Sequence, residues 1–260
     1  MSWPAVAAAA ARPGSTVLWP MGATEQHGPH LPLATDALFA DRLADAVLAR
    51  LPETAPIWRL PVQWLGFSPE HLGFAGTLSL GAEAMIALVC GVGEQLADSG
   101  FRRLVLFNAH GGQIALLEVA ARELRRRRPQ LAVLPTFLWR GAALAELIPA
   151  PERRHGLHAG LAETSLMLHL APELVGSQRQ ADGQLAAPPP PGWSLEGAIP
   201  TAWLSHDISR SGVIGDPGGA DAALGAQLEA ALCDGWTRLL EGLLASDWPP
   251  LAGGQGPAPL

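Results

Sequence analysis

Short apolar segments alternate with longer segments of helical periodicity along most of this chain. The clearest case is a strand predicted at residues 103–107, which lies between helices predicted at 80–99 and 112–128. A strand that is apolar on both faces is typical of a parallel sheet covered by helices on each side. Gly100 and Pro129 mark the ends of the two helices, because glycine favours a helix C-terminus and proline cannot continue a helix. The alternation predicts an α/β fold with a mainly parallel sheet.

The same pattern predicts the remaining elements. Further strands are expected at residues 16–21, 57–62 and 131–135, and further helices at 37–51, 162–170 and 220–244. The segment 180–191 contains four consecutive prolines and is expected to be a loop or extended spacer. A turn near Asp216 leads into the last helix, and Asp216 is expected to cap that helix. We predict one domain over residues 1–250, followed by a flexible C-terminal tail at 251–260.

Charge and composition exclude several classes of function. The formal net charge is -7, and a nucleic-acid-binding protein would normally present a basic face. The chain has no lysine, which excludes Schiff-base chemistry on lysine and a P-loop. Its two cysteines, Cys90 and Cys233, lie far apart and are expected to be buried as small apolar residues. A small-molecule substrate is therefore more consistent with the composition than a nucleic acid.

Nothing in the sequence predicts secretion or membrane insertion. The apolar stretch at residues 5–11 is short and has no basic segment before it, so we do not expect a signal peptide. No apolar run reaches the roughly 18–20 residues needed to span a bilayer. We therefore expect a cytoplasmic protein that does not associate with a membrane.

The segment 22–36 carries the densest chemical signal. Glu25 and His27 are two residues apart, so an extended backbone would point both side chains the same way. Glycine and proline then force a turn that can return Asp36 to the same place. Two carboxylates and an imidazole suit divalent ions such as zinc or manganese. Taken singly, these residues could be surface acids, helix caps or a turn histidine; taken together, they favour a metal site.

His110 follows the strand at 103–107 directly and precedes a helix. In open parallel sheets, ligands bind beyond the carboxyl ends of the strands, so His110 is a candidate ligand, although a turn residue is an equal alternative. Gly111 is the first of two glycines that would let the backbone approach a substrate. Because the segment lacks the G-x-G-x-x-G pattern, it is a poor dinucleotide fingerprint.

His158 and Glu163 form a third candidate group. If a helix starts near Gly160, Glu163 lies in its first turn, where the helix dipole favours an acid. That acid could serve the helix alone. In the functional interpretation Glu163 is a metal ligand or an acid/base group, and His158 exchanges a proton with the substrate.

Other histidines are weaker candidates. His71 lies in an irregular loop and is either a substrate contact or a structural residue. His30 and His206 are expected to line the pocket, with His30 contacting the substrate. His155 and His169 are expected to be surface or packing residues.

Taken together, these segments resemble the creatininase family of creatinine amidohydrolase-like proteins. The matching stretches are GATEQHGPHLPLATD, FNAHGG, HAGLAETS and, more loosely, GTLSL and GVIGDP. The resemblance implies a three-layer α/β/α sandwich with a mainly parallel sheet, a two-metal centre and a homo-oligomer, often a hexamer. By position, Glu25, His27, Asp36 and His110 match the metal ligands, with Asp36 bridging the two ions.

One position departs from creatininase itself. That enzyme has a glutamate ligand where this chain has Gly112, which makes creatinine a doubtful substrate and Glu163 the natural replacement ligand. Relatives that carry HGG here include a formylamino-pyrimidine deformylase and the mycofactocin precursor peptidase.

The resemblance implies an amidohydrolase that cuts a non-peptide or cyclic C–N bond. The alternatives are a formamide deformylase, a peptidase acting on a small modified peptide, and a non-catalytic metal-binding protein. In the expected mechanism two Zn²⁺ or Mn²⁺ ions, or Fe²⁺, share Asp36 and activate a water. His158 then protonates the departing nitrogen, while His71, Gly111 and His30 contact the substrate.

Overall fold

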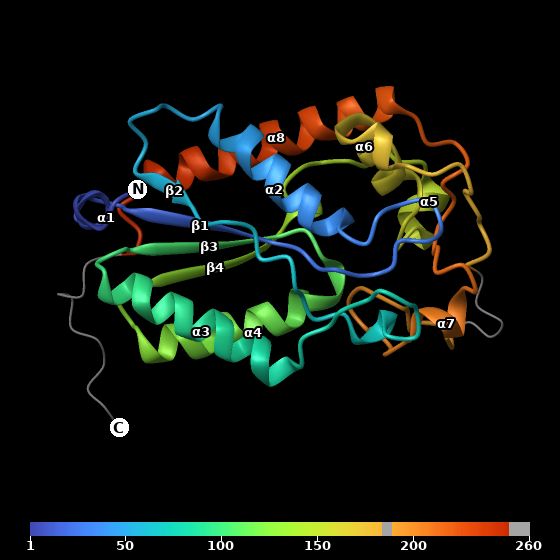
Figure 1. The fold of residues 1–260 in the computed structure, drawn as a ribbon, viewed down its shortest axis with the longest axis horizontal. Helices are drawn as coiled ribbons and strands as arrows, with labels where there is room; N and C mark the ends of the chain where they lie inside the picture. The colour runs from blue at the N-terminus through green and yellow to red at the C-terminus, as the bar shows by residue number, and fades with distance from the viewer. Residues whose placement is uncertain (184–188, 250–260) are drawn as a thin grey trace.

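The computed structural model describes residues 1–183 and 189–249, and in it four parallel strands form one sheet. The strand order is β2-β1-β3-β4, so the first strand lies in the interior of the sheet (Figure 1). The register aligns Thr16 with Arg103 and Arg103 with Ala132, which brings the carboxyl ends of β1, β3 and β4 to one edge. The strands are β1 (Thr16–Met21), β2 (Ile57–Arg59), β3 (Arg103–Asn108) and β4 (Ala132–Phe137).

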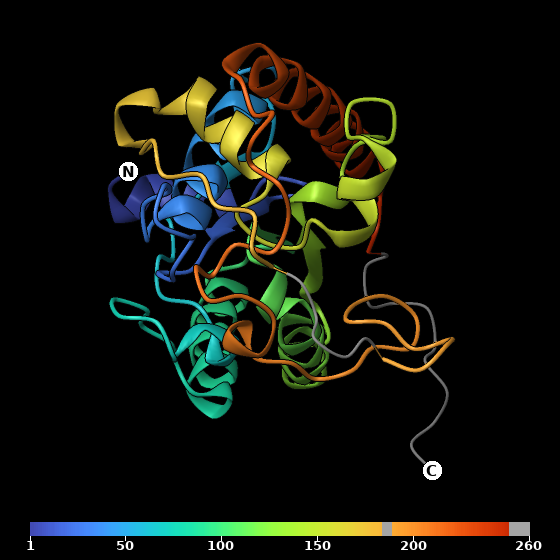
Figure 2. The same ribbon diagram turned by 90° about the vertical axis from the view of Figure 1, so that its right-hand side faces the viewer.

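Helices cover both faces of this sheet. Figures 1 and 2 show α3 and α4 on one face and α2, α6 and α8 on the other. The α-helices are α1 (Trp3–Ala10), α2 (Thr35–Leu48), α3 (Ala82–Asp98), α4 (Ile114–Arg127), α5 (Ala150–His155), α6 (Leu161–Leu170), α7 (Ser205–Ile208) and α8 (Ala222–Leu244). Short 3-10 helices are η1 (Pro69–His71), η2 (Gly111–Gln113), η3 (Leu138–Arg140) and η4 (Pro172–Leu174). The predicted three-layer α/β/α arrangement is confirmed.

The apolar strand β3 supplies both layers of the core. Leu104 and Leu106 pack into the cluster that faces α3 and α4, whereas Val105 and Phe107 pack into the cluster that faces α2 and α8. All four are fully or almost fully buried. Side chains alternate between the two faces of a strand, so a strand covered on both sides must be apolar at every position. This is the physical reason for the uninterrupted run.

The element boundaries differ from the predictions in three informative places. β2 ends at Arg59 instead of residue 62, because Pro61 has no N–H to donate to the sheet; single hydrogen bonds from Leu60 and Gln63 to β1 continue past it. The apolar stretch near the N-terminus, for which no secondary structure was predicted, forms the helix α1. Asp216 bonds the N–H of Gly218 within its turn, and it is Asp221 that caps α8 by accepting from the N–H of Leu224.

Other expectations are met. Both cysteines are buried and unpaired. Gly100 follows α3 with φ of +102°, the left-handed conformation that glycine adopts without cost. Within residues 1–183 and 189–249, no helix combines the length and the apolar character that crossing a membrane requires. The domain limits stay a prediction, and the predicted tail at 251–260 lies outside the described residues.

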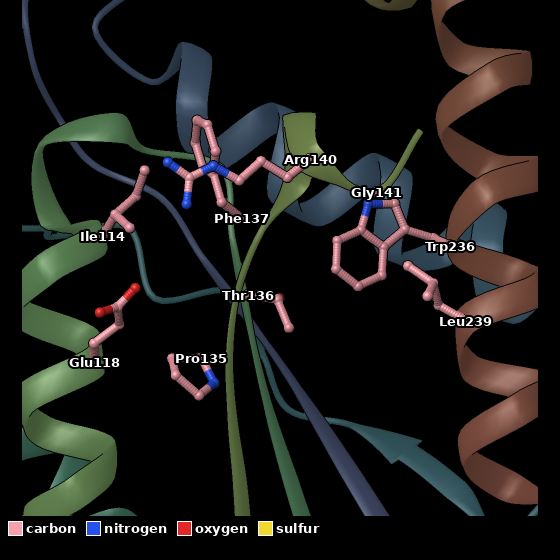
Figure 3. A pocket seen from close by; sticks show the side chains of 9 residues that line it. All are labelled: Ile114, Glu118, Pro135, Thr136, Phe137, Arg140, Gly141, Trp236 and Leu239. Atoms are coloured by element: carbon pink, nitrogen blue, oxygen red, sulfur yellow. The ribbon is translucent and has the colours of Figure 1, made fainter. Parts of the chain in front are cut away.

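A pocket of about 220 Å³ lies beside β4, one of the two edge strands of the sheet (Figure 3). In this view α4 contributes Ile114 and Glu118 from one side, and α8 contributes Trp236 and Leu239 from the other. Its lining holds one acid and one arginine and none of the predicted site residues. This pocket is therefore not the candidate site.

Candidate metal centre

The candidate site lies where β1 and β3 end. Glu25 and His27 follow β1, His110 follows β3, and Asp36 lies in the first turn of α2. The fifth residue, Glu163, lies in the first turn of α6. Ligand sites of open parallel sheets are expected at this edge. The structure therefore brings together all five residues that the sequence predicted as metal ligands.

Backbone carbonyls fix the orientation of both histidine rings. His27 Nδ1 lies 3.1 Å from the carbonyl oxygen of Glu25, and His110 Nε2 lies 2.9 Å from that of Phe67. A carbonyl oxygen only accepts hydrogen bonds, so these nitrogens donate. When each ring is neutral, as a metal ligand must be, its other nitrogen (Nε2 of His27, Nδ1 of His110) carries the lone pair. This is the usual arrangement of metal-binding histidines.

The two free nitrogens face the same pair of carboxylates. His110 Nδ1 lies 3.1 Å from both Glu25 Oε1 and Asp36 Oδ2. His27 Nε2 lies 3.5 Å from Asp36 Oδ1 and 4.0 Å from Glu25 Oε1. Asp36 therefore turns one oxygen toward each histidine. A carboxylate in this position can bridge two ions.

Burial makes this cluster electrostatically unbalanced without a cation. Burial opposes a charged His27, but Asp36, Glu163 and Glu25 outweigh it and raise the pKa of His27 to about 9. Burial likewise opposes a charged His110, and Glu25 and Asp36 raise its pKa well above the usual value. Burial raises the pKa of Glu163 to about 7. The carboxylates thus attract protons, as they would attract a metal ion.

The residues present fit a divalent metal pair. Glu25 Oε2 and His27 Nε2 are buried and have no hydrogen-bond partner among the residues that the structure describes. Leaving such groups unpaired costs about 1–3 kcal/mol each, and a bound cation would remove that cost. His27, Asp36 and Glu163 each offer a ligand atom, with all three atoms within 4.8 Å of one another. Mixed imidazole and carboxylate donors suit zinc, manganese and iron.

Glu163 is held in place by an unusual backbone conformation. Its Oε2 accepts a hydrogen bond of 2.6 Å from the N–H of Ala159. Ala159 has φ of +53° and is fully buried; the left-handed conformation is unfavourable for a residue with a Cβ. Strain of this kind often occurs at functional sites. Here it aims an N–H at one carboxylate oxygen of Glu163, and the carboxylate can still offer a ligand atom beside His27 and Asp36.

His158 lies between the other imidazoles of the site. Its ring centroid lies 4.2 Å from those of both His27 and His71, with the ring planes tilted by 40° and 32°. His158 Nε2 lies 2.6 Å from the carbonyl oxygen of Gln26 and therefore donates, which leaves Nδ1 facing Glu25 Oε1 at 3.8 Å. Burial and the nearby histidines lower the pKa of His158 well below its usual value. The ring is therefore neutral, and Nδ1 is its nitrogen without a hydrogen bond to the backbone.

His71 is fixed by hydrogen bonds at Nδ1, and its Nε2 faces the cluster. Its Nδ1 contacts Gln26 Nε2 at 2.8 Å and Ser205 Oγ at 2.7 Å, and its Nε2 lies 3.6 Å from Glu25 Oε1. Burial lowers the pKa of His71 to about 4. The ring is therefore neutral over the physiological range.

A cavity of about 350 Å³ opens onto the cluster. His71, Gly111 and His158, three of the predicted substrate or catalytic residues, line it. The large apolar side chains of the lining are Phe137, Trp139, Leu144, Ile148, Leu157 and Trp203. A second cavity of about 1030 Å³ adjoins the first and shares four lining residues with it: Glu152, Arg153, Leu157 and Glu196.

Two histidines expected in the pocket lie elsewhere. His30 is buried away from the cavity lining, with Nε2 2.9 Å from Thr164 Oγ1, so it supports the start of α6. His206 is exposed on α7 and is also absent from the cavity lining. His155 is exposed, and His169 bonds Glu229 at 2.7 Å on the surface, as expected for surface residues.

Sequence reasoning missed three residues that shape the site. Asn108 makes two hydrogen bonds to the backbone of His110, accepting at 2.9 Å and donating at 2.8 Å. Gln113 is fully buried and bonds Asn108 and the carbonyl oxygen of Gly22, which ties β3 to β1. Glu70 lines the cavity 3.7 Å from His110 Nε2. The position of Asn108 at the end of a buried strand was a usable signal; the other two required the fold.

Comparison with known proteins agrees with this geometry. The family model Creatininase, described as creatinine amidohydrolase, matches residues 1–240. A mycofactocin precursor peptide peptidase of Mycobacterium ulcerans (strain Agy99) is 37% identical over 227 residues, which cover 84% of this chain and 82% of that protein. The creatinine amidohydrolase of Pseudomonas putida is 32% identical over 205 residues, covering 73% and 77%.

Solved structures give the same result. A crystal structure of creatinine amidohydrolase (creatininase) superposes with a TM-score of 0.75 at 25% identity, over 95% of this chain and 96% of that one. The solved structure "Creatininase Mn" has a TM-score of 0.75 at 24% identity, over 95% of this chain and 97% of that one, a level of identity at which the match shows the fold alone. With the family model spanning most of the sequence and two groups of curated relatives above 30% identity, this chain belongs to the creatininase family of hydrolases.

Proposed function

We propose that this protein is a metal-dependent peptidase that hydrolyses an amide bond in a short peptide. The observation that carries the proposal is the convergence of free imidazole nitrogens and buried carboxylates at the floor of an open cavity. His27, Asp36 and Glu163 would hold one ion, and Glu25, His110 and the second oxygen of Asp36 would hold the other. When bound, such a pair polarises a carbonyl and supplies a water that ionises near neutral pH.

The chain's own residues would manage the proton of the reaction. His158 Nε2 is occupied by the carbonyl of Gln26, so only Nδ1 is free to act. We assign this nitrogen to accept a proton from the attacking water and to deliver it to the departing amine. General acid–base catalysis of this kind contributes about 10²- to 10⁴-fold in rate. His71, with its Nδ1 engaged and its Nε2 toward the cavity, would orient the substrate carbonyl.

The shape of the cavity favours a peptide over a small ring. The cavity over the metal cluster adjoins the larger one, and Glu152, Arg153, Leu157 and Glu196 line both. Ligand pockets of about 300–1,000 Å³ accommodate drug-sized molecules, and two such cavities in series leave room for several peptide residues. The 37% identity to a peptide peptidase supports the same choice. A non-peptide or cyclic amide, the first expectation from the sequence, is the competing substrate class.

A hydrolysis panel tests the proposal. Protein loaded with Mn²⁺ or Zn²⁺ is incubated with short unblocked peptides, an N-formyl amine and creatinine, and new amines are quantified by mass spectrometry. We expect peptide cleavage and no turnover of creatinine. Hydrolysis of the small amides alone would replace the peptidase with the amidohydrolase alternative. Two bound ions with no hydrolysis over the whole panel would contradict enzymatic function.

A matched variant shows which residue moves the proton. His158→Gln keeps a hydrogen-bond donor toward the carbonyl of Gln26 but has no titratable Nδ1. We expect it to retain metal and lose at least about 10²-fold in kcat, whereas His169→Gln on the surface should behave as wild type.

The homo-oligomeric assembly implied by the family resemblance stays a separate prediction, which sedimentation would test.

A further inference from the structure

Glu70 brings an additional carboxylate to the metal centre from a different part of the chain. It lies in the short helix η1, far in sequence from the predicted ligands. Its side chain is 13% exposed and lines the cavity beside Glu25 and His110. Glu25, Glu70 and His110 each offer a ligand atom, all within 4.8 Å of one another. This second group of three lies next to the group formed by His27, Asp36 and Glu163.

The absence of a side chain at Gly112 creates the space for this carboxylate. A Cβ atom built on Gly112 would lie 1.8 Å from Glu70 Oε1 and 2.7 Å from His110 Nε2. Real Cβ atoms do not approach other heavy atoms this closely, so any larger residue at 112 would displace Glu70. The backbone at Gly112 does not have a positive φ. The glycine is therefore explained by space, not by backbone conformation.

We propose that Glu70 is a ligand of the ion held by Glu25 and His110, and that Gly112 is required to admit it. This inference rests on the proposed metal-dependent function. Under this proposal Glu70 would serve the ion at Glu25 and His110, as Glu163 would serve the ion at His27 and Asp36. With Glu70, three acids (Glu25, Glu70 and the bridging Asp36) accompany His110, and they would hold a divalent ion more tightly than two, since each carboxylate adds charge and an oxygen donor.

Metal titration tests the inference without relying on activity. Metal-free protein is titrated with Mn²⁺ and with Zn²⁺ against a competing fluorescent chelator, and the number of ions and their affinities are fitted. Wild type should bind two ions. Glu70→Gln has the same shape with no charge, and it should weaken one ion at least ~10-fold and leave the other unchanged. Glu196→Gln, a carboxylate of the same cavity outside both groups, should leave both affinities unchanged.

A second variant tests the role of Gly112. Gly112→Ala should weaken the same ion as Glu70→Gln, because the added methyl group displaces the carboxylate. The double variant should bind this ion with about the same affinity as the more impaired of the two single variants, since both changes remove the same interaction. Should Gly112→Ala fail to fold, Glu70→Gln alone decides. Two ions bound to Glu70→Gln with wild-type affinities would overturn the inference, whereas a wild type that binds no ion would overturn the proposed function instead.

Discussion

Replacing Asp36 by asparagine should separate metal binding from folding. Asp36 places Oδ1 3.5 Å from His27 Nε2 and Oδ2 3.1 Å from His110 Nδ1, so both proposed ions depend on it. Asp36→Asn preserves the volume of a buried side chain and removes its charge. The variant should fold but lose affinity for both ions.

The size of the effect follows from linkage between binding and unfolding. At a free Mn²⁺ concentration 1,000-fold above Kd, one ion adds about 4 kcal/mol to the free energy of unfolding. For a domain of this size that raises the unfolding midpoint by roughly 8–16 °C. A ~100-fold loss of affinity in Asp36→Asn removes about 2.7 kcal/mol of that gain, or roughly 5–11 °C for each ion.

Differential scanning calorimetry with and without Mn²⁺ measures this loss. Asp45→Asn is the matched control, because Asp45 lies on the same helix and pairs with Arg59 at the surface. It should keep the full metal-induced shift and change stability by less than about 1 kcal/mol. If Asp36→Asn shows the same metal-induced shift as wild type, Asp36 is not a shared ligand and the reasoning fails.

Three further predictions concern pH, support of the site and packing. Because the folded-state pKa of His27, about 9, exceeds the 6.5 of an ordinary histidine, the metal-free fold binds this proton more tightly than the unfolded chain. Urea unfolding in a chelator should therefore show stability falling by about 3 kcal/mol from pH 6.5 to 9, and stability that rises over this window would count against the charge balance described. Asn108→Ala leaves buried backbone groups of His110 unpaired and should cost about 2–4 kcal/mol, with weaker metal binding by titration; unchanged stability would refute the bracing role. Gly225→Ala places a Cβ 2.0 Å from a carbonyl oxygen of α6 and should destabilise by at least about 1–3 kcal/mol. Gly242→Ala on the same helix meets nothing within 4 Å and should stabilise by about 0.5–1 kcal/mol; both are measured by thermal unfolding, and equal effects would contradict the packing argument.

Periodicity predicted the layers of the fold because the physical cause is local. A strand buried on both faces must be apolar at every position, and β3 displays this directly in residues 104–107. Strand β2 was predicted too long because its apolar character continues past Pro61, whereas regular strand pairing ends at Arg59 and only isolated hydrogen bonds to β1 follow. The helix α1 was missed because its alanine-rich sequence has no polar face that would show a helical period.

The candidate site was predictable where residues able to bind a metal directly follow a parallel strand. Glu25, His27 and His110 follow strands whose carboxyl ends meet at one edge, so their meeting follows from the topology. His30 looked equivalent in the same motif, but its ring turns to Thr164 on α6, and no sequence pattern distinguishes the two orientations. Glu70 was missed because its role depends on the empty volume at Gly112, which exists only in three dimensions.

Anomalous diffraction from crystals grown with Mn²⁺ tests the metal pair most directly. The structure predicts two peaks at the carboxyl edge of β1 and β3, one beside His27 and Glu163 and one beside His110 and Glu25, with Asp36 between them. Crystals with ample Mn²⁺ but no peak within reach of these side chains would contradict the metal centre and the hydrolytic function built on it.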